Sequence, residues 1–305
     1  MQDLINVMSK EEFISFSLRS LYSKLGYEKF RMSKFESYDL YVQNKDFLVS
    51  ENVITFTDTD GKLLALKPDV TLSIVKNNKD VKGIKKYYYN ENVYRVSKGA
   101  NSFKEIMQAG LECIGDITEE TISEVLLLAG KSLDLINENN VLVISHLDII
   151  KGVLDYSNVS SEGKAQIIKL LGEKNSFAIN AVINNEGIKG EKGELVKKLV
   201  SVYGEPSSTL EMLDCFCVDE TTKKAVWQLK RVIDAVTNSG FNKIMIDFSV
   251  VNDMKYYNGI SFKGFVEGVP TGILSGGEYD NLMKKMNKTS KAIGFAVYLD
   301  EVSRV

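Results

Sequence analysis

Residues 85–115 read KKYYYNENVYRVSKGANSFKEIMQAGLECIG, and this stretch decides the fold. Residues 85–96 and 106–115 are typical of β-strands, because aromatic and branched side chains alternate with polar ones. The polar segment 97–105 joins the two strands and predicts an antiparallel pair.

The second strand of this pair has an unusual polar face. Strand alternation places Gln108, Gly110 and Glu112 on one side, opposite an apolar side that includes Leu111. A carboxylate and an amide on either side of a glycine would suit the floor of a small polar pocket. A solvated sheet face with a glycine bulge would carry the same residues. Arg95, near the end of the first strand, suits either a bidentate anion clamp or a surface ion pair.

Further elements extend outward from this pair. Ser9 and Glu12 form a capping box that starts a helix, and Gly26 is placed to end it. Asp60-Gly61 predicts a hairpin within 53–66, and Pro68 lies in or just before the first turn of the next helix. The remaining predicted elements are a helix in 116–140, strands in 141–147, 243–250 and 255–265, a strand, turn and helix in 272–286, and a strand passing into a helix in 291–305. In 272–286, Gly276-Gly277 is expected at the turn, with Glu278 and Asp280 in the first turn of the helix.

The order of these elements predicts an α+β fold around a mainly antiparallel sheet. Residues 150–240 contain mostly helical patterns and are interpreted as an insertion between two parts of one sheet. The sequence therefore predicts a single domain over 1–305, with this helical insertion inside it.

Composition excludes several classes of protein. The 305 residues carry 38 Lys+Arg and 41 Asp+Glu, a formal net charge of −3 that argues against general nucleic-acid binding. No apolar run approaches the length of a membrane span, and the first residues lack the apolar core of a signal peptide. Three cysteines cannot form a disulfide scaffold, so we expect a cytoplasmic protein.

Metal and triad chemistry find little support in the sequence. The single histidine, His146, lies in an apolar run and is expected to have a structural or solvent-edge role. Multi-histidine zinc sites and Ser-His-Asp triads both depend on imidazole. Cys215 and Cys217 are interpreted as small core side chains, with a metal or redox role as the alternative.

Taken together, four segments resemble the catalytic core of histidyl-tRNA synthetase and its paralogues. LLALKPDVTLSIVKN (63–77) resembles the Leu-Arg-Pro-(Asp/Glu)-x-Thr segment of that family, and 87–115 resembles its second class motif with Gln-x-x-x-Glu-x-x-Gly. Residues 246–262 resemble the histidine-specific Tyr-Tyr-x-Gly-x-x-Phe segment. SGGEYDNLMKKM (275–286) followed by AIGFAVYLDEV (292–302) resembles the Gly-Gly-x-Tyr-Asp segment and the third class motif. The resemblance runs from about residue 9 to 305 and implies the class II synthetase fold.

The departures from the family pattern concentrate at positions that hold ATP in synthetases. Asn252 stands where the histidine-specific segment has an arginine, and Asp300-Glu301 replaces the Glu-Arg that ends the third motif. The Gly-Arg-x-Arg loop is here Asn101-Ser102-Phe103-Lys104. Glu278 replaces the arginine of Gly-Gly-Arg-Tyr-Asp, and Ser33 lies about where the first motif has its proline. A carboxylate in place of an arginine beside a triphosphate exchanges attraction for repulsion, roughly 4 kcal/mol of each sign at about 4 Å and an effective dielectric near 20. The chain also ends directly after the third motif, so no anticodon-binding domain is expected.

With these departures, the chain resembles the regulatory subunits of ATP phosphoribosyltransferase, which are non-catalytic synthetase paralogues. The resemblance implies no cofactor, no tRNA binding and no membrane contact. It implies instead a homodimer within a hetero-octamer with the short catalytic subunit, at the first step of histidine biosynthesis, with L-histidine as effector. Asp69, Thr71, Gln108, Glu112 and Tyr257 match positions that hold the amino acid in synthetases, and with Arg95, Tyr256 and Gly276 they form the predicted effector site.

Two other functions stay open at this point. An orphan synthetase paralogue could activate an amino acid for an acceptor other than tRNA. This function needs a working ATP site, and Asn252 and Glu301 argue against one. A nucleic-acid-binding scaffold would show salt-dependent tRNA binding, and the acidic balance disfavours it.

Overall fold

The computed structural model describes residues 7–48, 53–80, 82–96, 102–251, 254 and 256–304. The main feature is a nine-stranded sheet in the order β1-β5-β6-β12-β11-β10-β7-β9-β8. Its pairs are antiparallel except β1–β5 and β7–β9, which confirms the predicted α+β class with a mainly antiparallel sheet.

The predicted strand pair lies towards one edge of this sheet. β5 (Ile84–Val96) and β6 (Phe103–Gly115) pair antiparallel over their whole lengths. β12 (Lys291–Tyr298), β11 (Leu274–Glu278) and β10 (Asn258–Val266) follow, each antiparallel to its neighbour. The other strands of the sheet are β1 (Glu28–Lys29), β7 (Asn140–His146), β9 (Ile244–Asp247) and β8 (Tyr203–Gly204).

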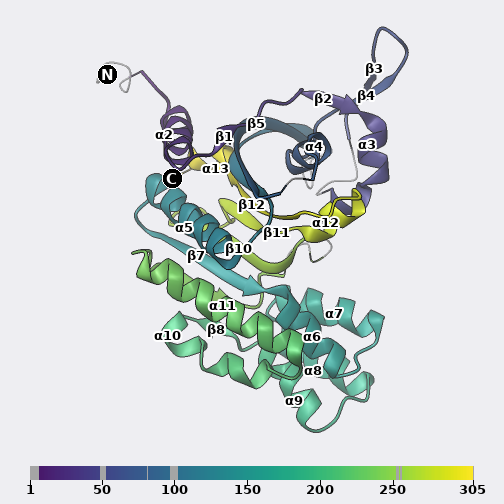
Figure 1. Ribbon diagram of the computed structural model, residues 1–305. Helices are drawn as coiled ribbons and strands as arrows, with labels where there is room; N and C mark the ends of the chain where they lie inside the picture. The colour runs from purple at the N-terminus through teal and green to yellow at the C-terminus, as the bar shows by residue number, and fades with distance from the viewer. Residues whose placement is uncertain are drawn as a thin grey trace.

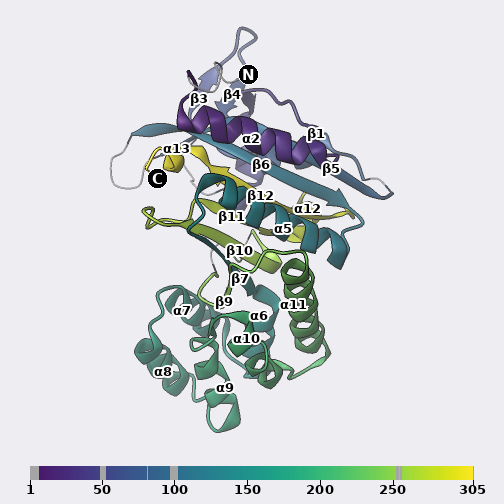
Figure 2. The same cartoon turned by 90° about the vertical axis from the view of Figure 1, so that its left-hand side faces the viewer.

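One face of the sheet is covered by long helices. α2 (Lys10–Lys24) and α5 (Glu119–Ile136) lie across it, as Figure 2 shows, and α13 (Leu299–Val302) follows β12. The capping box of α2 forms as predicted between Ser9 and Glu12, and Gly26 adopts a φ of 83° just past the helix end.

The opposite face carries smaller elements. They are α4 (Thr71–Asn77), α12 (Asp280–Lys285), α3 (Tyr38–Gln43), the short turn η1 (Lys45–Phe47) and a three-stranded sheet of β2 (Phe35–Ser37), β4 (Leu63–Leu66) and β3 (Thr55–Thr57). The β3–β4 hairpin projects from the body of the protein (Figure 1). It turns at Gly61, whose φ of 79° suits glycine. α4 begins at Thr71, so Pro68 lies ahead of the first turn.

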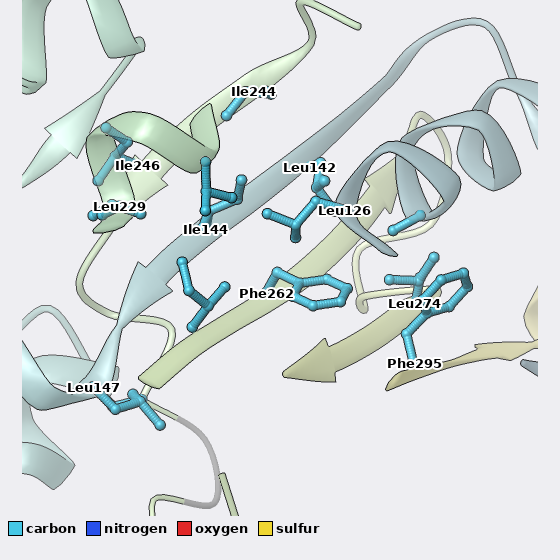
Figure 3. Close-up of a cluster of buried hydrophobic side chains, with 14 of the residues drawn as sticks. Leu126, Leu142, Ile144, Leu147, Leu229, Ile244, Ile246, Phe262, Leu274 and Phe295 are labelled. Carbon is cyan, nitrogen blue, oxygen red and sulfur yellow. The ribbon is translucent and has the colours of Figure 1, made fainter. Parts of the chain in front are cut away.

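A helical lobe lies below the sheet in Figure 1. It contains α6 (Leu147–Tyr156), α7 (Ser161–Gly172), α8 (Ser176–Asn185), α9 (Glu191–Leu199), α10 (Pro206–Thr209), η2 (Met212–Phe216) and α11 (Glu220–Asn238). The lobe shares one hydrophobic core with the α2–α5 face of the sheet. Part of that core is shown in Figure 3, where Ile144 lies among Leu142, Phe262 and Leu229. No helix in the described ranges is long and apolar enough to cross a membrane.

A substitution at Ile144 would test the packing of this shared core. Its side chain is fully buried, and Ile144→Ala should lower the free energy of unfolding by about 2–5 kcal/mol, because the cavity that it leaves cannot fully collapse. Urea unfolding would measure the change. Ile84→Ala is the control: this isoleucine is 37% exposed, and the loss should stay under about 1 kcal/mol. Equal losses at the two positions would contradict the described packing.

Candidate functional site

The floor of the candidate site is a patch of small residues on the α4 face of the sheet. The register aligns Glu112 of β6 with Gly294 of β12 and Gly277 of β11. A Cβ at position 294 would lie 1.7 Å from Oε2 of Glu112, and one at 277 would lie 2.8 Å from the ring of Tyr257. The two functional side chains therefore occupy space that only glycine leaves free.

This arrangement corrects one prediction. Gly276 and Gly277 lie inside β11 and not in a turn before α12, and Glu278 is the last residue of the strand. The reason is that both faces of the strand are crowded: Gly277 leaves room for Tyr257 above the floor, and a Cβ at Gly276 would lie 2.6 Å from the ring of Phe262 on the core face, a constraint that local turn chemistry does not reveal.

A cavity of about 460 Å³ opens over this floor. All eight residues of the predicted effector site line it: Asp69, Thr71, Arg95, Gln108, Glu112, Tyr256, Tyr257 and Gly276. They come from four separate parts of the sequence, and the solvated-face interpretation of Gln108 and Glu112 is wrong, since each is only 2% exposed.

Glu112 is the acid at the centre of the floor. Thr71 Oγ1 donates a hydrogen bond to Oε1 at 2.8 Å, and Tyr279 Oη donates to Oε2 at 2.8 Å. Burial disfavours the charged carboxylate and raises its pKa to about 8, although the two hydroxyl donors oppose the shift. The carboxyl group is therefore largely protonated near neutral pH in the folded protein, and a cationic ligand beside it would favour the charged form.

A second acid, Asp69, lies beside Arg95. Asp69 Oδ1 accepts a hydrogen bond from the backbone N–H of Leu72 at 2.9 Å, while Arg95 Nη2 lies 3.7 Å from Asp69 Oδ2. Arg95 also donates through Nε to the carbonyl oxygen of Pro68 at 2.8 Å. Burial raises the pKa of Asp69, and the Arg95 charge opposes that shift. Arg95 is 9% exposed, so the surface ion-pair interpretation is wrong.

Tyrosines form one wall of the cavity. The ring centroids of Tyr256 and Tyr257 are 4.8 Å apart, and those of Tyr256 and Tyr279 are 6.0 Å apart. The sequence interpretation missed Tyr279, as well as Tyr89, Lys263, Ser275 and Tyr298, which also line the cavity. For Tyr89, Ser275, Tyr279 and Tyr298 a signal exists in the sequence, because all four belong to the segments that resemble the family motifs.

The described positions that depart from the synthetase pattern are not among the residues that line this cavity. Glu301 accepts a hydrogen bond from Arg304 Nη1 at 2.6 Å, and Asp300 Oδ1 accepts one from the backbone N–H of Met107 at 3.0 Å. Glu278 is 7% exposed and accepts the N–H of Ile260 at 2.7 Å. Asn101 and Asn252 lie outside the described residues.

The other side chains with potential chemistry lie apart from the cavity. His146 is buried, and its Nε2 lies 2.9 Å from Oε1 of Gln228, in line with a structural role. Cys215 is exposed and Cys217 is half-buried, so the prediction of two core side chains is wrong for Cys215. Within the described ranges, no group of three or more His, Cys, Asp and Glu side chains could hold a metal ion.

Comparison with known proteins identifies the family. A family model described as histidyl-tRNA synthetase matches residues 4–302. An ATP phosphoribosyltransferase regulatory subunit from Caldanaerobacter subterraneus subsp. tengcongensis is 31% identical over 296 residues, which cover 95% of this chain and 76% of that protein. The chain belongs to the histidyl-tRNA synthetase-like family of ATP phosphoribosyltransferase regulatory subunits.

Solved structures of this family share the fold. An ATP phosphoribosyltransferase regulatory subunit/histidyl-tRNA synthetase from Bacillus halodurans superposes with a TM-score of 0.85 at 22% identity, over 96% of this chain and 78% of that one. A chain of the ATP phosphoribosyl transferase complex from Thermotoga maritima superposes with a TM-score of 0.74 at 18% identity, over 95% of this chain and 97% of that one. The fold is that of the class II aminoacyl-tRNA synthetases, as the resemblance implied.

The raised pKa of Glu112 predicts a pH effect on stability. The folded protein keeps its proton up to about pH 8, whereas the unfolded chain loses it near the ordinary value of 4.5. The stabilising contribution of protonated Glu112 to the free energy of unfolding is therefore complete below pH 4.5. It is lost as the pH rises to 8, at a slope of up to about 1.4 kcal/mol per pH unit. Glu112→Gln cannot ionise, so its stability relative to the wild type should increase between pH 5 and pH 8.

Urea unfolding of both proteins at several pH values would measure this difference. The readout is how the stability difference between the two proteins changes with pH, and not its absolute value. The substituted amide changes the hydrogen bonds of Thr71 and Tyr279 at every pH. A constant difference across the range would mean that Glu112 ionises normally in the folded protein.

Proposed function

We propose that this chain is a non-catalytic regulatory subunit that activates a short-form ATP phosphoribosyltransferase and takes part in its feedback inhibition by L-histidine. The observation that carries the proposal is the cavity: it is lined by Asp69, Thr71, Gln108, Glu112 and Tyr257, which match positions that hold the amino acid in synthetases, in a chain whose relatives are named as regulatory subunits. The ligand would be the effector itself, bound with no cofactor.

A different set of residues supports the loss of synthetase chemistry. Activation of an amino acid by ATP needs cations that stabilise the charge developing on the phosphates. Glu301 and Asp300 put carboxylates where the third motif has its terminal Glu-Arg, and Glu301 is already engaged by Arg304. Asn252 removes another arginine. We therefore propose that the amino-acid end of the ancestral site persists while the ATP end does not.

The proposed setting is a cytoplasmic assembly of this chain with the short catalytic subunit, as a homodimer within a hetero-octamer and without tRNA. The similar chain from Thermotoga maritima belongs to an ATP phosphoribosyl transferase complex, which supports this setting by similarity. For histidine to inhibit, it must bind the inhibited and active assemblies with different affinities.

Reconstitution tests the proposal. This chain mixed with the short catalytic subunit of the same organism should stimulate formation of phosphoribosyl-ATP, and L-histidine should reduce the stimulated rate. Failure to form a complex and to stimulate would contradict the regulatory assignment. Amino-acid-dependent pyrophosphate exchange by this chain alone would instead favour the orphan synthetase.

Glu112→Lys tests the pocket within that assay. A buried ammonium in place of the acid should raise the inhibitory concentration of histidine roughly tenfold or more, because the ligand loses a hydrogen-bond partner and its cationic groups meet a like charge. Glu162→Lys, an exposed charge reversal on α7, is the matched control and should leave inhibition unchanged. Glu112→Gln and a thermal unfolding curve separate a binding defect from misfolding. Unaltered inhibition in a folded Glu112→Lys protein would mean that the effector binds elsewhere.

A further inference from the structure

Lys263 enters the cavity from the strand opposite the acids. It lies on β10, where its Cα pairs with Ser275 of β11 on one side and with Val143 of β7 on the other. Strand alternation places it on the same face as Ser261, and both residues line the cavity. In the sequence, Lys263 lies one residue beyond the segment 246–262 that resembles the histidine-specific motif.

The floor between Lys263 and the acids is made of small residues. The register runs from Lys263 to Ser275, then to Ala296 of β12 and Gly110 of β6, which lies between Gln108 and Glu112. Three interstrand spacings separate the ends of this row, about 14 Å in all. A Cβ at Gly110 would lie 2.5 Å from Tyr89 Oη, so an aromatic side chain closes this floor from above at the β5 end. A ligand above Ser275 and Ala296, which both line the cavity, would therefore lie between Lys263 and the Tyr89 ring.

The charges of the lining are divided between the two ends of this row. Among the residues that line the cavity, the acids are Asp69 and Glu112 and the bases are Arg95 and Lys263. Arg95 lies beside Asp69 and the carbonyl of Pro68, so its charge is partly offset there. Among the lining residues, Lys263 is the base on the β10 side. Next to it, Ser275 Oγ lies 2.9 Å from Tyr298 Oη, which gives this end two hydroxyls.

We infer that Lys263 binds the carboxylate of a zwitterionic amino acid, with the Ser275 hydroxyl as a second donor, while the acids at the other end take its cationic and N–H groups. The inference rests on the proposed function of the cavity as the effector site and adds to it a specificity residue. A neutral zwitterion carries both charges and needs complementary groups at both ends. A ligand without a carboxylate would leave the Lys263 end unused.

The experiment pairs a change in the protein with a change in the ligand. Calorimetric titration would measure the dissociation constants of L-histidine and of L-histidinol, in which a hydroxymethyl group replaces the carboxylate, for this chain alone and in complex with the catalytic subunit. Lys263→Met should weaken L-histidine roughly tenfold or more. The same substitution should change L-histidinol less than about twofold, and Lys263→Arg should retain most of the affinity for L-histidine.

Lys224→Met, the same charge change at an exposed position of α11, is the control and should alter neither constant. Equal weakening of both ligands by Lys263→Met would show a structural role, and unchanged binding of L-histidine would show that its carboxylate lies elsewhere. Either result overturns the inference and leaves the proposed function standing. Absence of L-histidine binding by the wild-type complex would instead overturn the proposed effector site, and this inference with it.

Discussion

The cavity depends on one steric constraint, the contact between the Glu112 carboxyl and the backbone of Gly294. Any side chain at position 294 would occupy the space of that carboxyl. Because β12 is glycine there, Glu112 lies low on the sheet, within reach of the hydroxyls of Thr71 and Tyr279. The two hydrogen bonds offset the free-energy cost of burying this acid, and the buried carboxyl group can recognise a polar ligand.

The rest of the fold holds this contact in place. β6 and β12 pair over eight aligned positions, and the opposite face of both strands packs into the core under α2 and α5. A sheet fixed from behind gives a rigid floor, while the walls come from α4 and from the segments that flank β10 and β11. Ligand sites built on regular elements in this way hold their side chains more precisely than sites built on loops.

The distribution of charge gives the cavity its chemical character. The acids stand over β6 and at the start of α4, and Lys263 stands on β10 at the far end of the small-residue floor. In the described part of the chain, the carboxylates of Asp300 and Glu301 lie after β12 and are engaged with Met107 and Arg304. The separation of the acids from Lys263 within the cavity suits the recognition of a small zwitterion better than the binding of a polyphosphate.

Sequence alone determined the strand pair, because alternation in 85–115 is a local signal, and the resemblance of four segments to the synthetase family supplied the order of the elements and pointed to eight residues that line the cavity. It could not determine that Gln108, Glu112 and Arg95 are buried, because burial depends on α4 and the tyrosine wall, which come from distant parts of the chain. It also misplaced Gly276-Gly277, since the need for small residues beside Phe262 on one face and Tyr257 on the other arises only when β10, β11 and β12 lie side by side. Lys263 gave no signal in the sequence. Only the cross-strand register, a long-range property set by packing and hydrogen bonding between strands, places it opposite the acids.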